Sequence, residues 1–309
     1  MSTKTHSTNA AWFAAWAAAA ALAGLALPVL AATRDFSAQK PADPAGTVEI
    51  VNVEGSIEVT GWNQPMVEVT GKLGTRVERV DVTSNANRTT IRVVIPNGGS
   101  NWHGETAADL KIHVPQNSSL DVSLVSADLR TNGVGGNQHL QTVSGDIQGE
   151  VGGGELQVDT VSGDVNLTAH NGHNAQIKSV SGDINLTGTS GDLSLNTVSG
   201  DTIATLGDLA RAKLESVSGD INVTAGALAA QGQFEATTVS GDLKLHFATQ
   251  PDADIDVQSF SGEISNCFGP KPVEERYGPG SRLNFRNGKG GGRVHIDSKS
   301  GDVALCAGK

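Results

Sequence analysis

The sequence contains few aromatic residues, little positive charge and almost no cysteine. Of its 309 residues, aromatic residues make up 4% and charged residues 18%, and only two are cysteine. With so few aromatic residues, a hydrophobic core must be built mostly from Val, Ile and Leu. The 22 Lys and Arg are outnumbered by 33 Asp and Glu, which gives a net charge of −11. This excess argues against a nucleic-acid partner, because phosphate backbones bind basic surfaces.

The sequence also lacks the motifs of common enzymes. It has no G-x-S-x-G elbow, no HExxH motif and no P-loop, so we expect neither catalytic residues nor a bound cofactor. Glycine, in contrast, is abundant, and its 38 residues predict many turns. Hydrophobic residues at 38% are still enough for a core, so we do not expect a disordered chain.

The first 31 residues have the features of a signal peptide. Between Lys4 and Arg34 there is no charged residue, and residues 10–27 form an apolar block rich in Ala and Leu. Small residues follow the block, so we expect cleavage after Ala31. The alternative is an uncleaved membrane anchor, since the block approaches the roughly 20 residues that span a bilayer. Either way we expect export to the periplasm or the cell surface, with residues 32–46 as a polar linker.

The body of the chain is a repeat. Near-identical copies of V-S-G-D, such as TVSGDVN and SVSGDIN, begin at residues 142, 160, 179, 197, 216 and 238. Weaker copies flank them, so that the serine of the motif recurs at positions 126, 144, 162, 181, 199, 218, 240, 261 and 300. The steps are 18 to 22 residues long, apart from one of 39. A fixed period of this length is typical of a solenoid.

Each copy alternates apolar and polar residues, which predicts a β-strand with one buried face. We expect the valine before the serine and the apolar residues three and five positions after it to point inward, as in Val161, Val165 and Leu167. A second short alternation, such as Leu156 and Val158, follows each motif. Coils stacked at about 4.8 Å would share one core and parallel hydrogen bonds. The expected fold is an all-β, parallel β-solenoid (β-helix) with coils of about 18–20 residues.

Residues 47–125 are expected to form divergent coils and a cap, before the VSGD repeat of residues 126–309. Residues 53–60 copy the motif, and further strands are expected at 77–82, 89–95, 109–114 and 120–125. The cap should differ from the repeat because an exposed edge strand invites aggregation.

These residues resemble a known family. The V-S-G-D-[IV] coils, the L-x-I-x-V-P-x-x-x-x-L-x-V segment at residues 110–122 and the closing SKSGDVALC are similar to bacterial exported β-solenoid proteins called "putative adhesins", a domain of unknown function. The resemblance covers residues 46–309. It implies a protein of the cell envelope or surface, and it supplies no catalytic residues.

The aspartate of the motif is the most repeated candidate for a site residue. We expect a structural role, in which the glycine adopts a turn with positive φ and the aspartate accepts backbone N–H groups. Stacking would also place the carboxylates about 4.8 Å apart, where they repel by about 1 kcal/mol. Calcium could relieve that repulsion, and the alternative interpretation is a calcium site with the candidate ligands Asp164, Asp183, Asp192 and Asp201.

The two cysteines occupy the same position of consecutive copies. Cys267 and Cys306 each follow the serine of a motif by six residues, so stacking makes them neighbours. Neighbouring coils suit the Cα separation of about 4.4–6.8 Å that a disulfide needs, and an exported setting permits the bond. We therefore expect a disulfide rather than a metal site.

The long step of the repeat carries the densest positive charge. Residues 268–293 hold six Lys and Arg against two Glu. Residues 281–286 and 292–297 flank an Asn-Gly turn, which predicts a β-hairpin that caps the last coil. The alternative is a recognition site for an anionic envelope polymer, with the candidate residues Lys271, Arg276, Tyr277, Arg282, Arg286, Lys289 and Arg293.

The sequence favours an exported, non-enzymatic protein of the cell envelope that acts as an adhesin or binding scaffold. Its expected partner is an envelope polysaccharide or a surface protein, and copies could associate end to end if a cap is poor. Two alternatives stay open. One is a polysaccharide lyase or hydrolase, which needs paired carboxylates in a groove. The other is a component of envelope-stress signalling that binds a protein.

Overall fold

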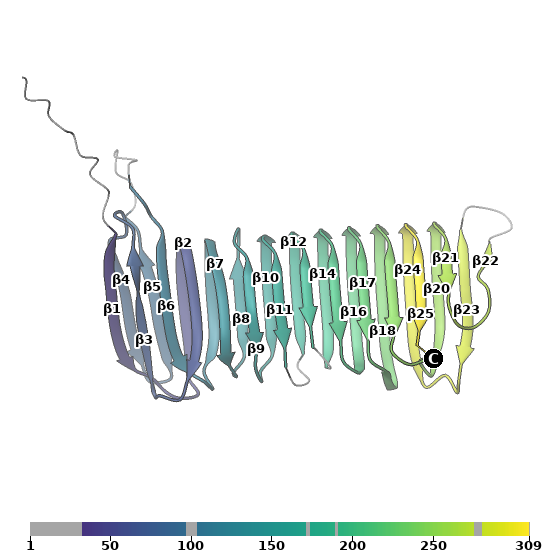
Figure 1. The fold of residues 1–309 in the computed structure, drawn as a ribbon, viewed down its shortest axis with the longest axis horizontal. Coiled ribbons are helices and arrows are strands. Elements are labelled where there is room, and N and C mark those ends of the chain that lie inside the picture. Colours follow the sequence, from purple (N-terminus) through teal and green to yellow (C-terminus); the bar gives the residue numbers. More distant parts are fainter. Residues whose placement is uncertain (1–32, 97–103, 171–173, 189–190, 275–279, 309) are drawn as a thin grey trace, which may run out of the picture. The chain divides into compact units, whose positions relative to one another are not determined.

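Val, Ile and Leu alternate with polar residues along the chain, and each alternating segment forms a β-strand (Figure 1). The computed structural model describes residues 33–96, 104–170, 174–188, 191–274 and 280–308. Every regular element in these residues is a strand, which confirms the all-β class. The same residues include no helix long and apolar enough to cross a membrane. The expected signal peptide, residues 1–31, lies outside them.

The strands fall into three groups along the chain. The N-terminal group is β1 (Arg34–Pro41), β2 (Thr47–Trp62), β3 (Met66–Leu73), β4 (Arg79–Asn85), β5 (Arg88–Val94), β6 (Ala108–Pro115) and β7 (Ser119–Val134). The central group is β8 (Gln138–Thr142), β9 (Ile147–Val151), β10 (Leu156–Ser162), β11 (Val165–Ala169), β12 (Ala175–Ser181), β13 (Ile184–Thr187), β14 (Asp192–Ser199), β15 (Thr202–Leu206), β16 (Leu209–Ser218), β17 (Ile221–Ala225), β18 (Leu228–Ser240) and β19 (Leu243–Phe247). The C-terminal group is β20 (Ala253–Ser261), β21 (Ile264–Asn266), β22 (Val273–Glu274), β23 (Ser281–Asn287), β24 (Gly292–Ser300) and β25 (Val303–Ala307).

The central strands form coils of two strands each. The strands β8, β10, β12, β14, β16 and β18 pair in parallel in a first ladder. The strands β9, β11, β13, β15, β17 and β19 pair in parallel in a second ladder. Equal positions of the motif lie opposite one another, so Ser162 pairs with Ser181 and Ser181 with Ser199. The parallel solenoid predicted from the period is confirmed.

One apolar core runs through the coils, but one predicted core position is wrong. Val158, Val165 and Leu167 point inward and are at most 1% exposed, as predicted. Val161, also predicted to point inward, is 47% exposed. The inward alternation of β10 continues to the buried Thr160, and the chain then turns a corner at which Val161 and the following serine both face outward.

In each near-identical copy of the motif, glycine follows the serine at the corner. Gly200, for example, has a φ of +120°, a backbone conformation that residues other than glycine rarely adopt. A Cβ atom on it would lie 2.2 Å from the carbonyl oxygen of Gly182 in the neighbouring coil. The glycines therefore allow both the turn and the close stacking of the coils.

The N-terminal strands are stacked out of sequence order. The strand β2 contributes to both ladders and lies between β7 on one side and β5 and β6 on the other, in parallel with all three. Beyond it, β4 pairs antiparallel with β5, and β3 pairs antiparallel with β6 and with β1. Residues 32–46 were expected to form a linker, but they contain β1, which covers the otherwise open edge of β3.

The C-terminal coil is also out of order. The strands β24 and β25 lie between the coil of β18 and β19 and the coil of β20 and β21 (Figure 1). The strand β23 pairs antiparallel with the other edge of β20, and β22 pairs with β23. The predicted hairpin of residues 281–286 and 292–297 is therefore wrong: both segments are strands, but β20 lies between them. The loop that joins them crosses the end of β20, where the Asp252 carboxylate accepts the backbone N–H groups of Lys289, Gly290 and Gly291.

Candidate functional site

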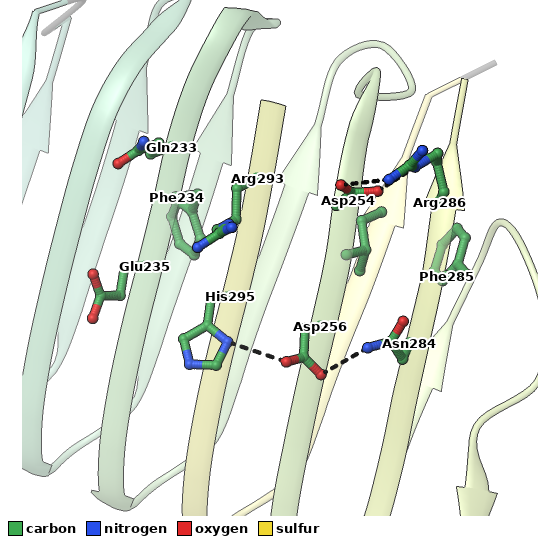
Figure 2. Close-up of a pocket in the computed structure, with 11 residues that line it drawn as sticks. Gln233, Phe234, Glu235, Asp254, Asp256, Asn284, Phe285, Arg286, Arg293 and His295 are labelled. Carbon is green, nitrogen blue, oxygen red and sulfur yellow. Dashed lines mark hydrogen bonds and ion pairs between the residues drawn. The ribbon is translucent and has the colours of Figure 1, made fainter. Parts of the chain in front are cut away.

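A groove of 950 Å³ lies on the outer face of the first ladder, near its C-terminal end (Figure 2). Four neighbouring strands line it, in the spatial order β18, β24, β20 and β23. Every second side chain of a strand faces outward, so these strands present rows of facing polar groups. The polar lining residues are Gln233, Glu235, Asp254, Asp256, Asn284, Arg286, Arg293 and His295.

The first row across the groove contains Gln233, Arg293, Asp254 and Arg286, each paired with the next across the strands. Arg286 donates two hydrogen bonds to Asp254, from Nε to Oδ1 at 2.6 Å and from Nη2 to Oδ2 at 3.1 Å. A two-point contact of this kind fixes the plane of the guanidinium. The two side chains are 64% and 47% exposed, so the pair contributes little to the stability of the fold.

The second row contains Glu235, His295, Asp256 and Asn284. Asn284 donates a hydrogen bond from Nδ2 to Asp256 Oδ1 at 3.4 Å, and His295 Nδ1 lies 3.7 Å from Asp256 Oδ2. Figure 2 shows these side chains converging on Asp256 from the strands on either side. The row therefore offers amide, imidazole and carboxylate groups within a short distance of one another.

The charges of the groove nearly balance. Two arginines face three carboxylates among its lining residues. The hydrogen bond from Arg286, with the positive charges of Arg286 and Arg293, lowers the pKa of Asp254, and the same contact raises the pKa of Arg286. Asp254 therefore stays ionised at neutral pH. The site is mixed in charge rather than cationic.

The structure brings two of the seven predicted recognition residues, Arg286 and Arg293, into the groove. A third, Arg282, lies further along β23 and pairs with Asp256, with Nη2 3.6 Å from Oδ1. Two more are described but do not line the groove: Lys289 in the crossing loop and the exposed Lys271 between β21 and β22. The last two, Arg276 and Tyr277, lie outside the described residues.

The sequence reasoning missed the acidic half of the site. Asp252 comes directly before β20, and Asp254 and Asp256 alternate with apolar residues at its start, so that alternation alone places these two on one outward face. Their importance depends on β20 lying between β23 and β24, because this pairing sets each aspartate opposite a basic side chain or an N–H group. The predicted hairpin paired residues 281–286 with residues 292–297 directly, so the position of β20 between them was not expected.

The repeated aspartates form the expected column. Asp183 donates its backbone N–H to Asp164 Oδ1 at 2.9 Å, and Asp201 does the same to Asp183 at 2.8 Å. Asp192 lies outside this column, at the other turn of its coil, and its carboxylate accepts a hydrogen bond from Arg211 at 2.8 Å. Within the described ranges no group of three His, Cys, Asp or Glu residues is placed to hold a metal ion. Calcium binding by these four aspartates stays an untested prediction.

The two cysteines lie where the repeat predicted them. Cys267 follows β21 and Cys306 lies on β25, the strand beside it, and a disulfide joins them across a Cα–Cα distance of 4.8 Å. The bond ties the last coil in the sequence to the last coil in space. It lies on the second ladder, whereas the groove lies on the first.

Comparison with known proteins gives one family and several structures. The sequence model of the family described as Toastrack DUF4097 matches residues 42–306. No curated protein matches the chain.

The similar solved structures have low identity to this chain. One is a putative cell adhesion protein from Clostridium sporogenes ATCC 15579, with 9% identity and a TM-score of 0.25 over 89% of this chain and 100% of that one. A second is a putative lipid binding protein from Parabacteroides distasonis ATCC 8503, with 14% identity and a TM-score of 0.33 over 89% and 97%. A third is a putative adhesin from Bacteroides fragilis NCTC 9343, with 11% identity and a TM-score of 0.33 over 89% and 98%.

Proposed function

The chain belongs to the Toastrack family DUF4097, and from this membership and the C-terminal groove we propose that it is an exported, non-enzymatic binding protein of the cell envelope that holds a polysaccharide. The observation that carries the proposal is the groove itself. Its two rows combine hydrogen-bond donors and acceptors on strands of a rigid sheet, and binding sites on such elements are held more precisely than sites on loops.

The chemistry of the lining fits a polyhydroxylated ligand. A sugar hydroxyl donates one hydrogen bond and accepts others, so it needs both kinds of partner close together. Arginine supplies donors only, ionised carboxylates supply acceptors only, and the amides of Gln233 and Asn284 supply both. The near balance of charge favours a neutral or weakly charged saccharide over the polyanion that the basic sequence suggested.

Export is supported by two features. The apolar N-terminal block has the composition of a signal peptide, and the disulfide between Cys267 and Cys306 is typical of an oxidising compartment. An envelope location would also bring the groove into contact with polysaccharides.

Asp254, the carboxylate of the first row, is better suited to binding than to hydrolysis. A glycoside hydrolase needs a carboxylic acid with a raised pKa to protonate the leaving group. Asp254 has the opposite perturbation, because the hydrogen bond from Arg286 lowers its pKa. Its two oxygens are also occupied by that arginine, which leaves it poorly placed to attack a sugar.

The test is binding of the fluorescently labelled protein to purified envelope polysaccharides and to whole cells. The groove variant is Arg293→Gln, which removes a donor from the first row and keeps a polar side chain of similar length. The matched control is Arg92→Gln on β5, an exposed position with the same change of charge. We expect saturable binding by the native protein and by the control, and about tenfold weaker binding by Arg293→Gln, the effect of about one charge-assisted hydrogen bond.

Two outcomes would contradict the proposal. If native protein binds none of the polysaccharides or cells, polysaccharide recognition is excluded and the search moves to protein partners. If the two variants lose binding equally, the effect comes from net charge rather than from the groove. Release of reducing ends during the incubation would show that the protein is an enzyme.

A further inference from the structure

An exposed valine precedes the Ser-Gly-Asp turn in most coils, and stacking places these valines in one line along the solenoid. We call this line the valine ridge; in stacking order it contains Val53, Val125, Val143, Val161, Val180, Val198, Val217, Val239, Lys299 and Phe260. The valines are 39% to 49% exposed and Phe260 is 58% exposed. Only Lys299 interrupts the apolar surface. At about 4.8 Å per coil, the ridge is about 43 Å long.

The fold alone does not require valine at this corner. Threonine has nearly the same shape and an equally high preference for strands. The second ladder uses it at one outward row, which contains Thr168, Thr187, Thr205 and Thr224. The ridge instead keeps an apolar side chain in nearly every coil. A contiguous apolar surface of this kind on an acidic protein indicates an interaction site.

A groove of 520 Å³ runs beside the ridge along the same direction. Val180, Val198, Val217 and Val239 form one wall. The other wall consists of outward side chains of the first ladder, from Asp159 through Lys178 to Glu215, and the stacked hydroxyl residues that include Thr197 and Ser216 form the floor. The groove and the ridge therefore share one repeat, with one valine per coil.

The repeat favours a second copy of this chain as the occupant. The valines of the groove wall recur about every 4.8 Å, and the ridge of another copy presents small apolar groups at the same spacing. Along the whole ridge, the rows on either side, at about 7 Å each, give a strip of about 600 Å² per copy, and the 520 Å³ groove lies over five of its ten coils. The total of about 1,200 Å² is at the lower end of specific interfaces.

The ends of the stack are less suited to association than its side. At the C-terminal end the edge strands are β22, with two residues, and β21, with three. At the N-terminal end the edges are the antiparallel strands β1 and β4. Short or antiparallel edges give a parallel coil little to pair with. Lateral contact therefore fits the structure better than the end-to-end contact that the sequence suggested.

We propose that two copies of the chain associate side by side, with the valine ridge of each seated in the groove beside the ridge of the other. The arrangement is two-fold symmetric, because the same surface supplies both the ridge and the groove. In this interface Val198 and Val217 lie near the centre, where substitutions have the largest effect.

The test measures self-association by sedimentation velocity, with the full chain expressed with its own N-terminal segment. The ridge variant is Val198→Lys with Val217→Lys. The control is Thr205→Lys with Thr224→Lys, which adds the same charges to the same coils on the second ladder. At high salt, where net charge is screened, we expect a native dimer with a dissociation constant of about 1–100 µM, little change in the control, and at least about 100-fold weaker association in the ridge variant.

A milder pair of substitutions keeps the test decisive if lysine disturbs folding. Val198→Thr with Val217→Thr preserves the shape of the ridge and should weaken association about tenfold. A native protein that stays monomeric up to about 100 µM would overturn the proposal, and so would an equal loss in the ridge and control variants. Binding of an apolar dye to a monomeric native protein, lost in the ridge variant, would also overturn it, in favour of a small apolar ligand.

Discussion

At the scale of single residues, the aspartate of each Ser-Gly-Asp turn links its own coil to the next. Its Oδ1 accepts the backbone N–H of the acidic residue in the neighbouring coil, at distances of 2.8 to 3.1 Å through the whole repeat. These hydrogen bonds follow the spatial order of the coils rather than their order in the sequence. The N–H of Asp302 bonds to Asp242, and the N–H of Glu263 bonds to Asp302. The aspartate therefore satisfies a backbone donor that the strand ladders leave unpaired at the corner.

Substitution of one aspartate should weaken the stack by a small, measurable amount. Asp201→Ala removes the acceptor for the N–H of Asp220, and loss of this exposed hydrogen bond should cost about 0.5–1 kcal/mol. The melting temperature should fall by about 1–4 °C. Asp201→Asn keeps an oxygen in the same place and should melt close to the native protein. If the alanine variant is as stable as native, the ladder of carboxylates contributes nothing to stability.

Asp252 should make stability depend on pH in the acid range. Hydrogen bonds from the backbone N–H groups of Gly291, Lys289 and Gly290 lower its pKa below the ordinary value. A group whose pKa is lower in the folded state stabilises the fold above its unfolded pKa of about 3.9, and this contribution disappears as the pH falls through the folded value. The melting temperature of Asp252→Ala should therefore lie below that of native protein by a constant difference between about pH 5 and 8, and the difference should shrink below about pH 4. A difference that stays constant down to about pH 2 would contradict this interpretation.

At the scale of elements, each end region of the solenoid contains a coil that lies out of sequence order. The first complete coil, β2, lies inside the N-terminal strands, and the last coil, β24 and β25, lies inside the C-terminal ones. Neither of these coils is an end of the stack, so each has a neighbour on both sides. Terminal repeats of a solenoid have fewer contacts than internal ones and open first, and this arrangement counteracts that tendency.

Loss of the disulfide should loosen the C-terminal coils selectively. The bond closes a loop of 39 residues, for which the chain-entropy model gives about 3–4 kcal/mol. In the Cys267→Ser, Cys306→Ser variant, amide hydrogen exchange should accelerate in β20, β21, β24 and β25. Exchange in β10 to β15 should change little, because each repeat contacts only its neighbours. Equal acceleration along the whole chain would show that the solenoid unfolds as one cooperative unit.

The sequence predicts the composition of a coil well and the order of coils poorly. Alternation and period determine the two strands, the buried Val158 and Leu167, and the pairing of the cysteines. The spatial order at the ends cannot follow from the repeat, because copies with the same motif stack equally well on one another. The single step of 39 residues was the available signal, since it gives the chain enough length to pass over β20 and return. The positive charge of residues 268–293 was enough to predict the arginines of the groove. Their carboxylate partners could not be predicted, because they face the arginines only when β20 lies between β23 and β24.

At the scale of the whole molecule, the structure presents two surfaces that do not overlap in their lining residues. The polar groove contains residues of β18, β20, β23 and β24, and the groove beside the valine ridge contains residues of β10, β12, β14, β16 and β18. They share only β18, on which Gln233 and Glu235 line the first and Thr237 and Val239 line the second. If the polar groove binds a polysaccharide as proposed, a lateral dimer would present two such grooves to one polymer and would raise the avidity.

Ionic strength should affect dimerisation through the valine ridge and ligand binding in the polar groove differently. Because each copy carries a net charge of −11, two copies repel, and salt shortens the range of that repulsion from about 30 Å at 0.01 M to about 3 Å at 1 M. The apolar ridge gains from this screening, so the dissociation constant of the dimer should fall about tenfold over that range in sedimentation velocity. The Thr205→Lys, Thr224→Lys control, which is less acidic, should associate more tightly than native protein at low salt and equally at high salt. The proposed polysaccharide binding would use charge-assisted hydrogen bonds, so it should stay constant or weaken. A dimer that dissociates as salt rises would place charged contacts, not the valine ridge, at its interface.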